Sequence, residues 1–270
     1  VSISTFGLSM TSNFAAADGG AIAIADVDSD WDMDNCTFDG NLGPASGGAV
    51  SIVSSRLKML WTSSTFQNNV ASSGSGLDAG GAVSVSSGVS IVLSRLLFIN
   101  NTASYGGALS LGGRDQPSLG VLGRVEVTYC IFSNNSAATS GGAILLQGSQ
   151  LTPVYITGLT CTGNRAAVGG GCIVMDAFLG SALITGGWFE NNAVVNASAV
   201  SGDANDALEF INEGGGAVLA LNNGPVWPRV LPRVQIHSEL CKHFAGWRRR
   251  VTRSACHFRN VHVSRMQSGL

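Results

Sequence analysis

Five aspartates alternate with other residues between positions 26 and 34, and they form the densest group of candidate metal ligands in the sequence. Side chains two positions apart lie on the same face of an extended strand, so these carboxylates would share one face. Calcium suits such a face because it takes about six to eight oxygen ligands. Met33 stands where an EF-hand loop needs glycine, so a solvated acidic loop is the second interpretation. Calcium is the one cofactor that the sequence suggests, and its ligands would be Asp26, Asp28, Asp30, Asp32 and Asp34.

Carboxylates also cleave glycosidic bonds, and a repeated fold could gather them from successive turns. Asp26 and Asp176 each follow a short apolar run that begins after a pair of glycines, but the corresponding positions elsewhere hold Ser54, Ser87 and Gly148. No histidine precedes residue 237, and basic residues are scarce before that point. The sequence therefore predicts no catalytic residues and a noncatalytic protein, with a polysaccharide lyase or hydrolase as the alternative.

A third group of reactive side chains lies in residues 225–270, which differ in composition from the rest of the chain. Up to Gly224 there are six basic and 16 acidic residues, and after it there are nine basic residues and one acidic residue. Cysteine and histidine occur in this tail without the spacing of a zinc finger, and the arginines at 248–250 are of the kind that contacts nucleic acid or anionic membrane. Two interpretations remain open, a genuine basic segment, ordered or disordered, and a gene-model artefact. We predict a domain boundary at residue 224 and a non-repeat tail over 225–270.

Two short motifs alternate along residues 1–222 and must position all of the groups described above. The first is Phe-x-x-Asn or a close variant, and its asparagine, after a weaker copy ending at Asn13, stands at Asn41, Asn69, Asn101, Asn135, Asn164 and Asn192. The second is Gly-Gly-Ala followed by an aliphatic residue, and its second glycine, after a first copy at 19–22, stands at Gly48, Gly81, Gly107, Gly142, Gly171 and Gly216. Successive glycine pairs are 26 to 45 residues apart, so loops of variable length separate the repeats.

The residue types in these motifs suit a coil whose turns stack at the strand spacing of about 4.8 Å. Phenylalanine at equivalent sites would form an interior stack, asparagine tolerates a left-handed corner and can bond to the asparagine of the next turn, and paired glycines allow positive φ and close backbone approach. Aliphatic residues alternate after each glycine pair, as at Val50 and Ile52, which indicates strands with one buried face. The sequence therefore predicts an all-β chain, a parallel β-helix (solenoid) of about seven turns over residues 1–224.

The ordered pair of motifs resembles the repeat of the chlamydial polymorphic outer membrane proteins, the Pmp repeat, over about residues 1–222. The resemblance implies a right-handed, pectin-lyase-like β-helix that is displayed outside the cell and serves adhesion. Residues 225–270 match nothing in that family.

Localisation and partners follow from the same features. No run of about 18 apolar residues occurs, so no transmembrane segment is expected, and no nucleic-acid partner is expected for the β-helix. We expect an extracellular or cell-surface segment whose partner is a glycan or protein of a host or neighbouring cell. Cys36, Cys130 and Cys161 are predicted to be small buried residues, with a disulfide between neighbouring turns left open. Four Asn-x-Ser/Thr sequons would support secretion in a eukaryotic host, at Asn35, Asn100, Asn134 and Asn196.

Overall fold

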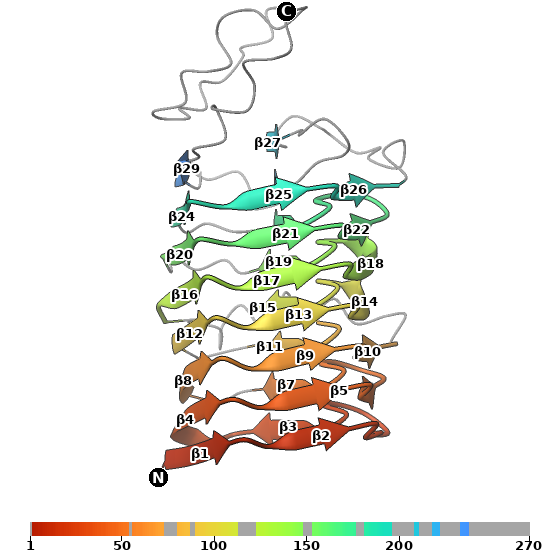
Figure 1. Cartoon of the computed structure of the whole chain (residues 1–270), viewed down its shortest axis with the longest axis vertical. Helices are drawn as coiled ribbons and strands as arrows, with labels where there is room; N and C mark the ends of the chain where they lie inside the picture. The colour runs from red at the N-terminus through yellow and green to blue at the C-terminus, as the bar shows by residue number, and fades with distance from the viewer. Residues whose placement is uncertain are drawn as a thin grey trace, which may run out of the picture.

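The chain folds into a right-handed parallel β-solenoid in which each turn lies on the preceding one (Figure 1). The computed structural model describes residues 2–53, 56–72, 80–86, 90–112, 123–147, 153–176, 181–195, 208–210, 218–221 and 233–237. These residues form strands and no helix, as the repeat pattern predicts. All of the strand pairs are parallel except the pair of β27 with β28.

Four sheets, here named A to D, run along the solenoid, and the chain passes through them in that order in each turn. Sheet A consists of β1 (Ser2–Phe6), β4 (Asp28–Asp34), β8 (Arg56–Thr62), β12 (Ser90–Ser94), β16 (Val125–Thr128), β20 (Val154–Thr157), β24 (Ser181–Thr185) and β29 (Arg233–His237). Sheet B consists of β2 (Ser9–Thr11), β5 (Thr37–Asp39), β9 (Thr65–Gln67), β13 (Leu97–Ile99), β17 (Ile131–Ser133), β21 (Thr160–Thr162) and β25 (Trp188–Glu190).

The other two sheets follow the asparagine and the glycine pair of each repeat. Sheet C consists of β6 (Leu42–Gly43), β10 (Val70–Ala71), β14 (Thr102–Tyr105), β18 (Ser136–Ser140), β22 (Arg165–Ala166) and β26 (Ala193–Val194). Sheet D consists of β3 (Ile22–Ala25), β7 (Val50–Val53), β11 (Val83–Val85), β15 (Leu109–Leu111), β19 (Ile144–Gln147), β23 (Ile173–Asp176), β28 (Val218–Leu221) and β27 (Leu208–Phe210).

The register of sheet B stacks the repeated phenylalanines in the interior. Phe38, Phe66, Phe98 and Phe132 are Cα partners in successive strands and are fully buried. Their ring centroids are 4.6 to 5.0 Å apart and their planes differ by 3° to 9°. These separations match the strand spacing of about 4.8 Å, so one aromatic residue per turn fills the core without a gap.

The number of regular turns is lower than the seven that the motifs predict. Among the described residues, five consecutive turns, from β4–β7 to β20–β23, each contribute one strand to all four sheets. Before them, β1–β3 lack a sheet C strand and have only the isolated bridge from Phe14 to Leu42 in its place. After them, β27 is inserted between β26 and β28. Motif copies therefore overestimate regular turns, because a degenerate or interrupted repeat still carries its motif.

The proposed boundary at residue 224 stays a prediction, because most of residues 225–270 lie outside the described residues. The described part of this segment is β29, and it pairs in parallel with β24 as the last strand of sheet A. No helix among the described residues is long and apolar enough to cross a membrane.

Candidate functional site

The repeat asparagines form a continuous hydrogen-bonded column at the corner between sheets B and C. Asn101 shows the pattern, since its Nδ2 donates to Asn135 Oδ1 and to the carbonyl of Phe66, both at 3.0 Å. Its Oδ1 accepts from the main-chain N–H and from Nδ2 of Asn69, also at 3.0 Å. The amide thus uses both of its donor hydrogens and both acceptor lone pairs, which is what a fully buried polar side chain requires. Side chains joined from turn to turn in this way are Asn13, Asn41, Asn69, Asn101, Asn135, Asn164 and Asn192.

The left-handed backbone at this corner belongs to the residue before the column, and not to the column asparagine itself. Asn68, Asn100, Asn134 and Asn191 have φ between 54° and 56° and are exposed. The two adjacent asparagines of a repeat therefore have different structural roles. The first makes the turn, because asparagine tolerates the left-handed region, and the second bonds neighbouring turns together.

The glycine pairs build the corner that leads into sheet D, and each glycine of a pair is needed for a different reason. Gly106 has a φ of +52°, which disfavours other residues. At Gly107 an added Cβ would lie 2.1 Å from the carbonyl oxygen of Gly142 and 2.7 Å from the nitrogen of Ser136. The same close approach to the next turn occurs at Gly20, Gly48, Gly81 and Gly142. Gly171 is buried in this corner, and Gly216 lies outside the described residues.

Cys161 and Cys172 form a disulfide across the interior of a single turn. Cys161 occupies the phenylalanine position, since it is the Cα partner of Phe132 and Phe189, and Cys172 replaces the buried alanine of the glycine motif. The sequence left open a bond between neighbouring turns, whereas this bond joins β21 of sheet B to the residue before β23 in the same turn. Cys36 and Cys130 are buried, as predicted, and are free thiols. Burial raises the pKa of the Cys130 thiol to about 11, against smaller opposing effects of backbone hydrogen bonds.

The aspartates between positions 26 and 34 lie at the N-terminal part of sheet A. Asp28, Asp30, Asp32 and Asp34 alternate along β4 with residues whose side chains point inward, while Asp26 is in the preceding bend with a φ of 56°. Neighbours on one face of a strand are roughly 6.5 Å apart, so a single ion would not reach all of them. Among the described residues no three acidic, histidine or cysteine side chains come together in a group that could hold a metal ion. Calcium binding here stays a prediction.

Acidic residues do not stack into a column on the outside of the solenoid. Across the described strands, no acidic residue is paired in register with an acidic residue of a neighbouring turn; Asp30 pairs with Lys58, and Asp32 pairs with Leu60. Asp26 lies in the bend that follows β3 and Asp176 ends β23, so both lie where the chain leaves sheet D, but five strand spacings, about 24 Å, separate their turns. The described residues therefore offer no paired carboxylates arranged for glycoside cleavage.

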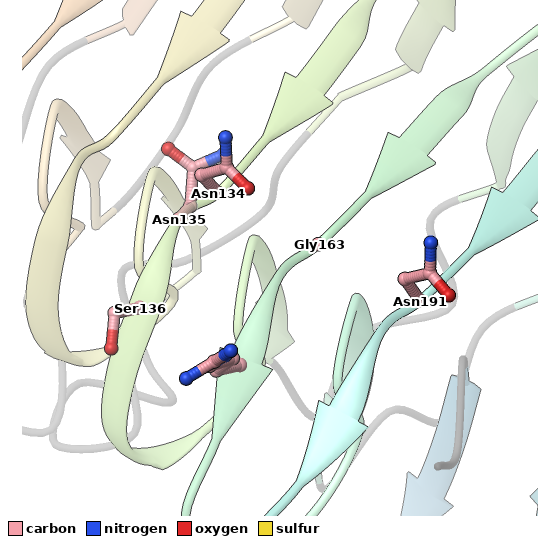
Figure 2. Close-up of a pocket in the computed structure, with 6 residues that line it drawn as sticks. Asn134, Asn135, Ser136, Gly163 and Asn191 are labelled. Atoms are coloured by element: carbon pink, nitrogen blue, oxygen red, sulfur yellow. The ribbon is translucent and has the colours of Figure 1, made fainter. Parts of the chain in front are cut away.

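A pocket of about 360 Å³ opens on the outside of the described solenoid, at the corner between sheets B and C (Figure 2). Gly163 lies in the bend between β21 and β22, with Asn134 in the preceding turn and Asn191 in the following one (Figure 2). An added Cβ on Gly163 would lie 2.4 Å from Asn134 Oδ1, so the absence of a side chain at this position makes room for the Asn134 amide. Arg165 is exposed and makes no ion pair with any described residue. The pocket is lined by Asn134, Asn135, Ser136, Gly163, Arg165 and Asn191.

Sequence reasoning found the column residue Asn135 in this lining but missed the pocket. The available signal was glycine in place of asparagine at the third position of the motif, which occurs at Gly40 and Gly163. Only Gly163 has an arginine two positions later, Arg165. That Asn134 and Asn191 lie on either side of Gly163 becomes evident only from the stacking of the turns.

Comparison with known families bears on the same part of the molecule. Residues 129–147, which run from the end of β16 through β17, β18 and β19, match the model of the Chlamydia polymorphic membrane protein (Chlamydia_PMP) repeat. The chain contains a Pmp repeat. This Pmp repeat includes both motifs, with Phe132 and Asn135 in the first and Gly141 and Gly142 in the second. The family is not known as an enzymatic one. No curated protein and no solved structure matches the chain.

Proposed function

We propose that this chain is a noncatalytic segment of an extracellular or cell-surface β-solenoid, and that it serves adhesion to a glycan or protein of another cell. One observation carries the proposal. The buried residues that recur from turn to turn, such as Phe98, Asn101 and Gly107, face inward or build corners. Outward-facing positions change in charge and polarity between turns, as Asp32 and its register partner Leu60 do in sheet A. A scaffold with a constant interior and a variable exterior suits recognition of a partner, as in other solenoid proteins.

Two further features support a location outside the cell. The match to a Pmp repeat suggests an outer-membrane or surface protein. The disulfide between Cys161 and Cys172 is the kind of bond that persists in oxidising compartments and is rare in reducing ones.

The proposal is tested by binding of the purified, fluorescently labelled chain to cultured cells. An unrelated β-solenoid of similar size and net charge is the control. We expect saturable binding above the control that unlabelled chain displaces, and binding equal to the control would refute the proposal. Incubation with uronate polymers tests the enzymatic alternative, because chain cleavage that is lost in Asp26→Ala or Asp176→Ala would establish a lyase or hydrolase.

A further inference from the structure

The turn that contains β21 forms a depression on the outer face of sheet B. Its outward residues are Thr160 and Thr162, which are half-buried. In the register of the sheet, Thr160 lies between Ile131 of the preceding turn and Trp188 of the following one. Both of these neighbours are larger and exposed, Trp188 by 48%. Thr160 therefore forms the floor of a trough one turn wide, with walls roughly 10 Å apart at the strand spacing. Thr162 continues this floor with a wall on one side only, because its register partners are Glu190 and the small Ser133.

Glycines at both corners of this turn extend the trough along the strand. Gly158 begins it and Gly163 ends it. A Cβ on Gly158 would lie 2.6 Å from the ring of Tyr129, so this exposed ring rests on the glycine. At the other end the chain passes from Thr162 directly to Gly163, which lines the pocket together with Arg165. The trough thus has an aromatic ring at one end and polar side chains at the other.

The chemistry of the trough combines one aromatic wall with hydrogen-bonding groups. The indole Nε1 of Trp188 donates to Glu190 Oε2 at 3.1 Å, which fixes the orientation of the exposed ring. About 10 Å further along the chain, at three residues of about 3.3 Å each, Asn191 brings its amide to the pocket. Asn134, Asn191 and Arg165 there offer both donors and acceptors. Among the residues named for the trough and the pocket, Arg165 and Glu190 carry opposite charges, so these residues together have no net charge.

We propose that this trough binds an uncharged oligosaccharide, an inference that rests on the proposed function in adhesion. One sugar ring lies with its apolar C–H face against Trp188, and the hydroxyl groups of the next bond to the amides and guanidinium of the pocket. The volume is within the usual range of small-ligand sites. A peptide strand is a poorer fit, because β21 is paired on both sides, with β17 and with β25, and offers no free edge for main-chain bonding.

The repeat itself supplies a variant that closes the pocket and preserves the fold. Gly163→Asn restores the residue that other turns hold at this left-handed position, and the atom it meets is the end of the flexible Asn134 side chain. Gly40→Asn makes the same change at the equivalent corner of another turn, where an added Cβ would meet only Ser12 Oγ at 3.6 Å. Trp188→Ala removes the aromatic wall, and Arg165→Gln removes the positive charge.

The experiment is titration calorimetry of the full chain, produced in bacteria so that no sequon is glycosylated. The probes are oligomers of glucose, mannose and galactose, with oligogalacturonate and a sialylated oligosaccharide as charged comparisons. We expect binding of at least one neutral oligomer, weakened at least tenfold by Gly163→Asn and by Trp188→Ala, and unchanged by Gly40→Asn. Binding that neither variant weakens, or binding of the charged probes alone with loss in Arg165→Gln, would overturn the assignment.

The cell assay separates this inference from the function on which it rests. If the unmodified chain binds cells and Gly163→Asn binds them equally well, adhesion stands and the trough is not its site. If the unmodified chain binds no better than the control solenoid, the proposed function itself fails.

Discussion

Replacing one asparagine of the buried column should destabilise the solenoid far more than replacing the asparagine beside it. We consider Asn101→Ala and Asn100→Gly, which alter consecutive residues of the same motif. Asn101 is fully buried and makes four side-chain hydrogen bonds at 3.0 Å to Asn69, Asn135 and Phe66. Asn100 is exposed and has a φ of 54°, a conformation that glycine adopts readily.

The size of the difference follows from the groups that lose partners. In Asn101→Ala, the main-chain N–H of Asn69 and one hydrogen of its amide lose their acceptor, and the carbonyl of Phe66 loses a donor. A buried polar group without a partner costs about 1–3 kcal/mol, so the three together amount to roughly 3 kcal/mol or more. Asn100→Gly removes a solvated side chain, and the free energy of unfolding should change by no more than about 0.5 kcal/mol.

The measurement is urea unfolding followed by far-UV circular dichroism. With a urea dependence of roughly 3 kcal/mol per molar for a chain of this size, the midpoint of Asn101→Ala should fall by about 1 M. The midpoint of Asn100→Gly should remain close to that of the unmodified chain. Equal midpoints for the two variants would show that the amide column contributes no more than the exposed corner, and would refute the reasoning.

Three further predictions concern the glycine corner and the cysteines. Gly107→Ala should prevent folding or lower the melting temperature sharply in a thermal scan, because its Cβ would lie 2.1 Å from a backbone oxygen. Gly7→Ala is the control, since nothing lies within 4 Å of the new Cβ, and it should lower the free energy of unfolding only by the roughly 1–2 kcal/mol that a left-handed alanine costs. Removing the disulfide by Cys161→Ala with Cys172→Ala should lower the free energy of unfolding by about 3 kcal/mol in urea titrations. Cys161→Phe with Cys172→Ala restores the residues of other turns and should recover part of that loss, because the phenylalanine ring fills the core. Equal free energies of unfolding for the two double variants would contradict this. The pKa of Cys130 is raised from 9.0 to about 11 in the folded chain, so the contribution of this thiol to stability is complete below pH 9 and decreases as the pH rises toward 11. Over this range the urea midpoint should therefore fall less in Cys130→Ala than in the unmodified chain.

The sequence predicts the scaffold well because its repeats constrain the register. Phenylalanine and asparagine at fixed offsets can stack only if the turns are parallel and aligned, and the structure has Phe66 paired with Phe98 and Asn69 bonded to Asn101. The separate roles of the two adjacent asparagines could not be predicted, because an asparagine at either position could make the left-handed turn or form the hydrogen bonds between turns. That distinction depends on φ, which the neighbouring turns determine.

The trough and the disulfide depend on single departures from the repeat, and these have meaning only after the turns are stacked. Cys161 and Cys172 lie in one repeat, and their spacing in the sequence is compatible with a bond. That they face each other across the core becomes evident only from the stacked positions of phenylalanine and alanine. Gly163 is one small residue in a glycine-rich chain. It creates a pocket because the turns on either side carry asparagine, which repeat counting alone does not show.

The column of asparagines has a direction. From Asn13 to Asn164 every amide donates to the oxygen of the following turn, and Asn192 accepts the last of these bonds. The side-chain dipoles therefore align and leave partial positive charge at the Asn192 end and partial negative charge at the Asn13 end. Any turn that extends the column must therefore bring an acceptor to Asn192 or a donor to Asn13. Two such solenoids that meet end to end can continue the column only head to tail, because an inverted contact sets donor against donor or acceptor against acceptor.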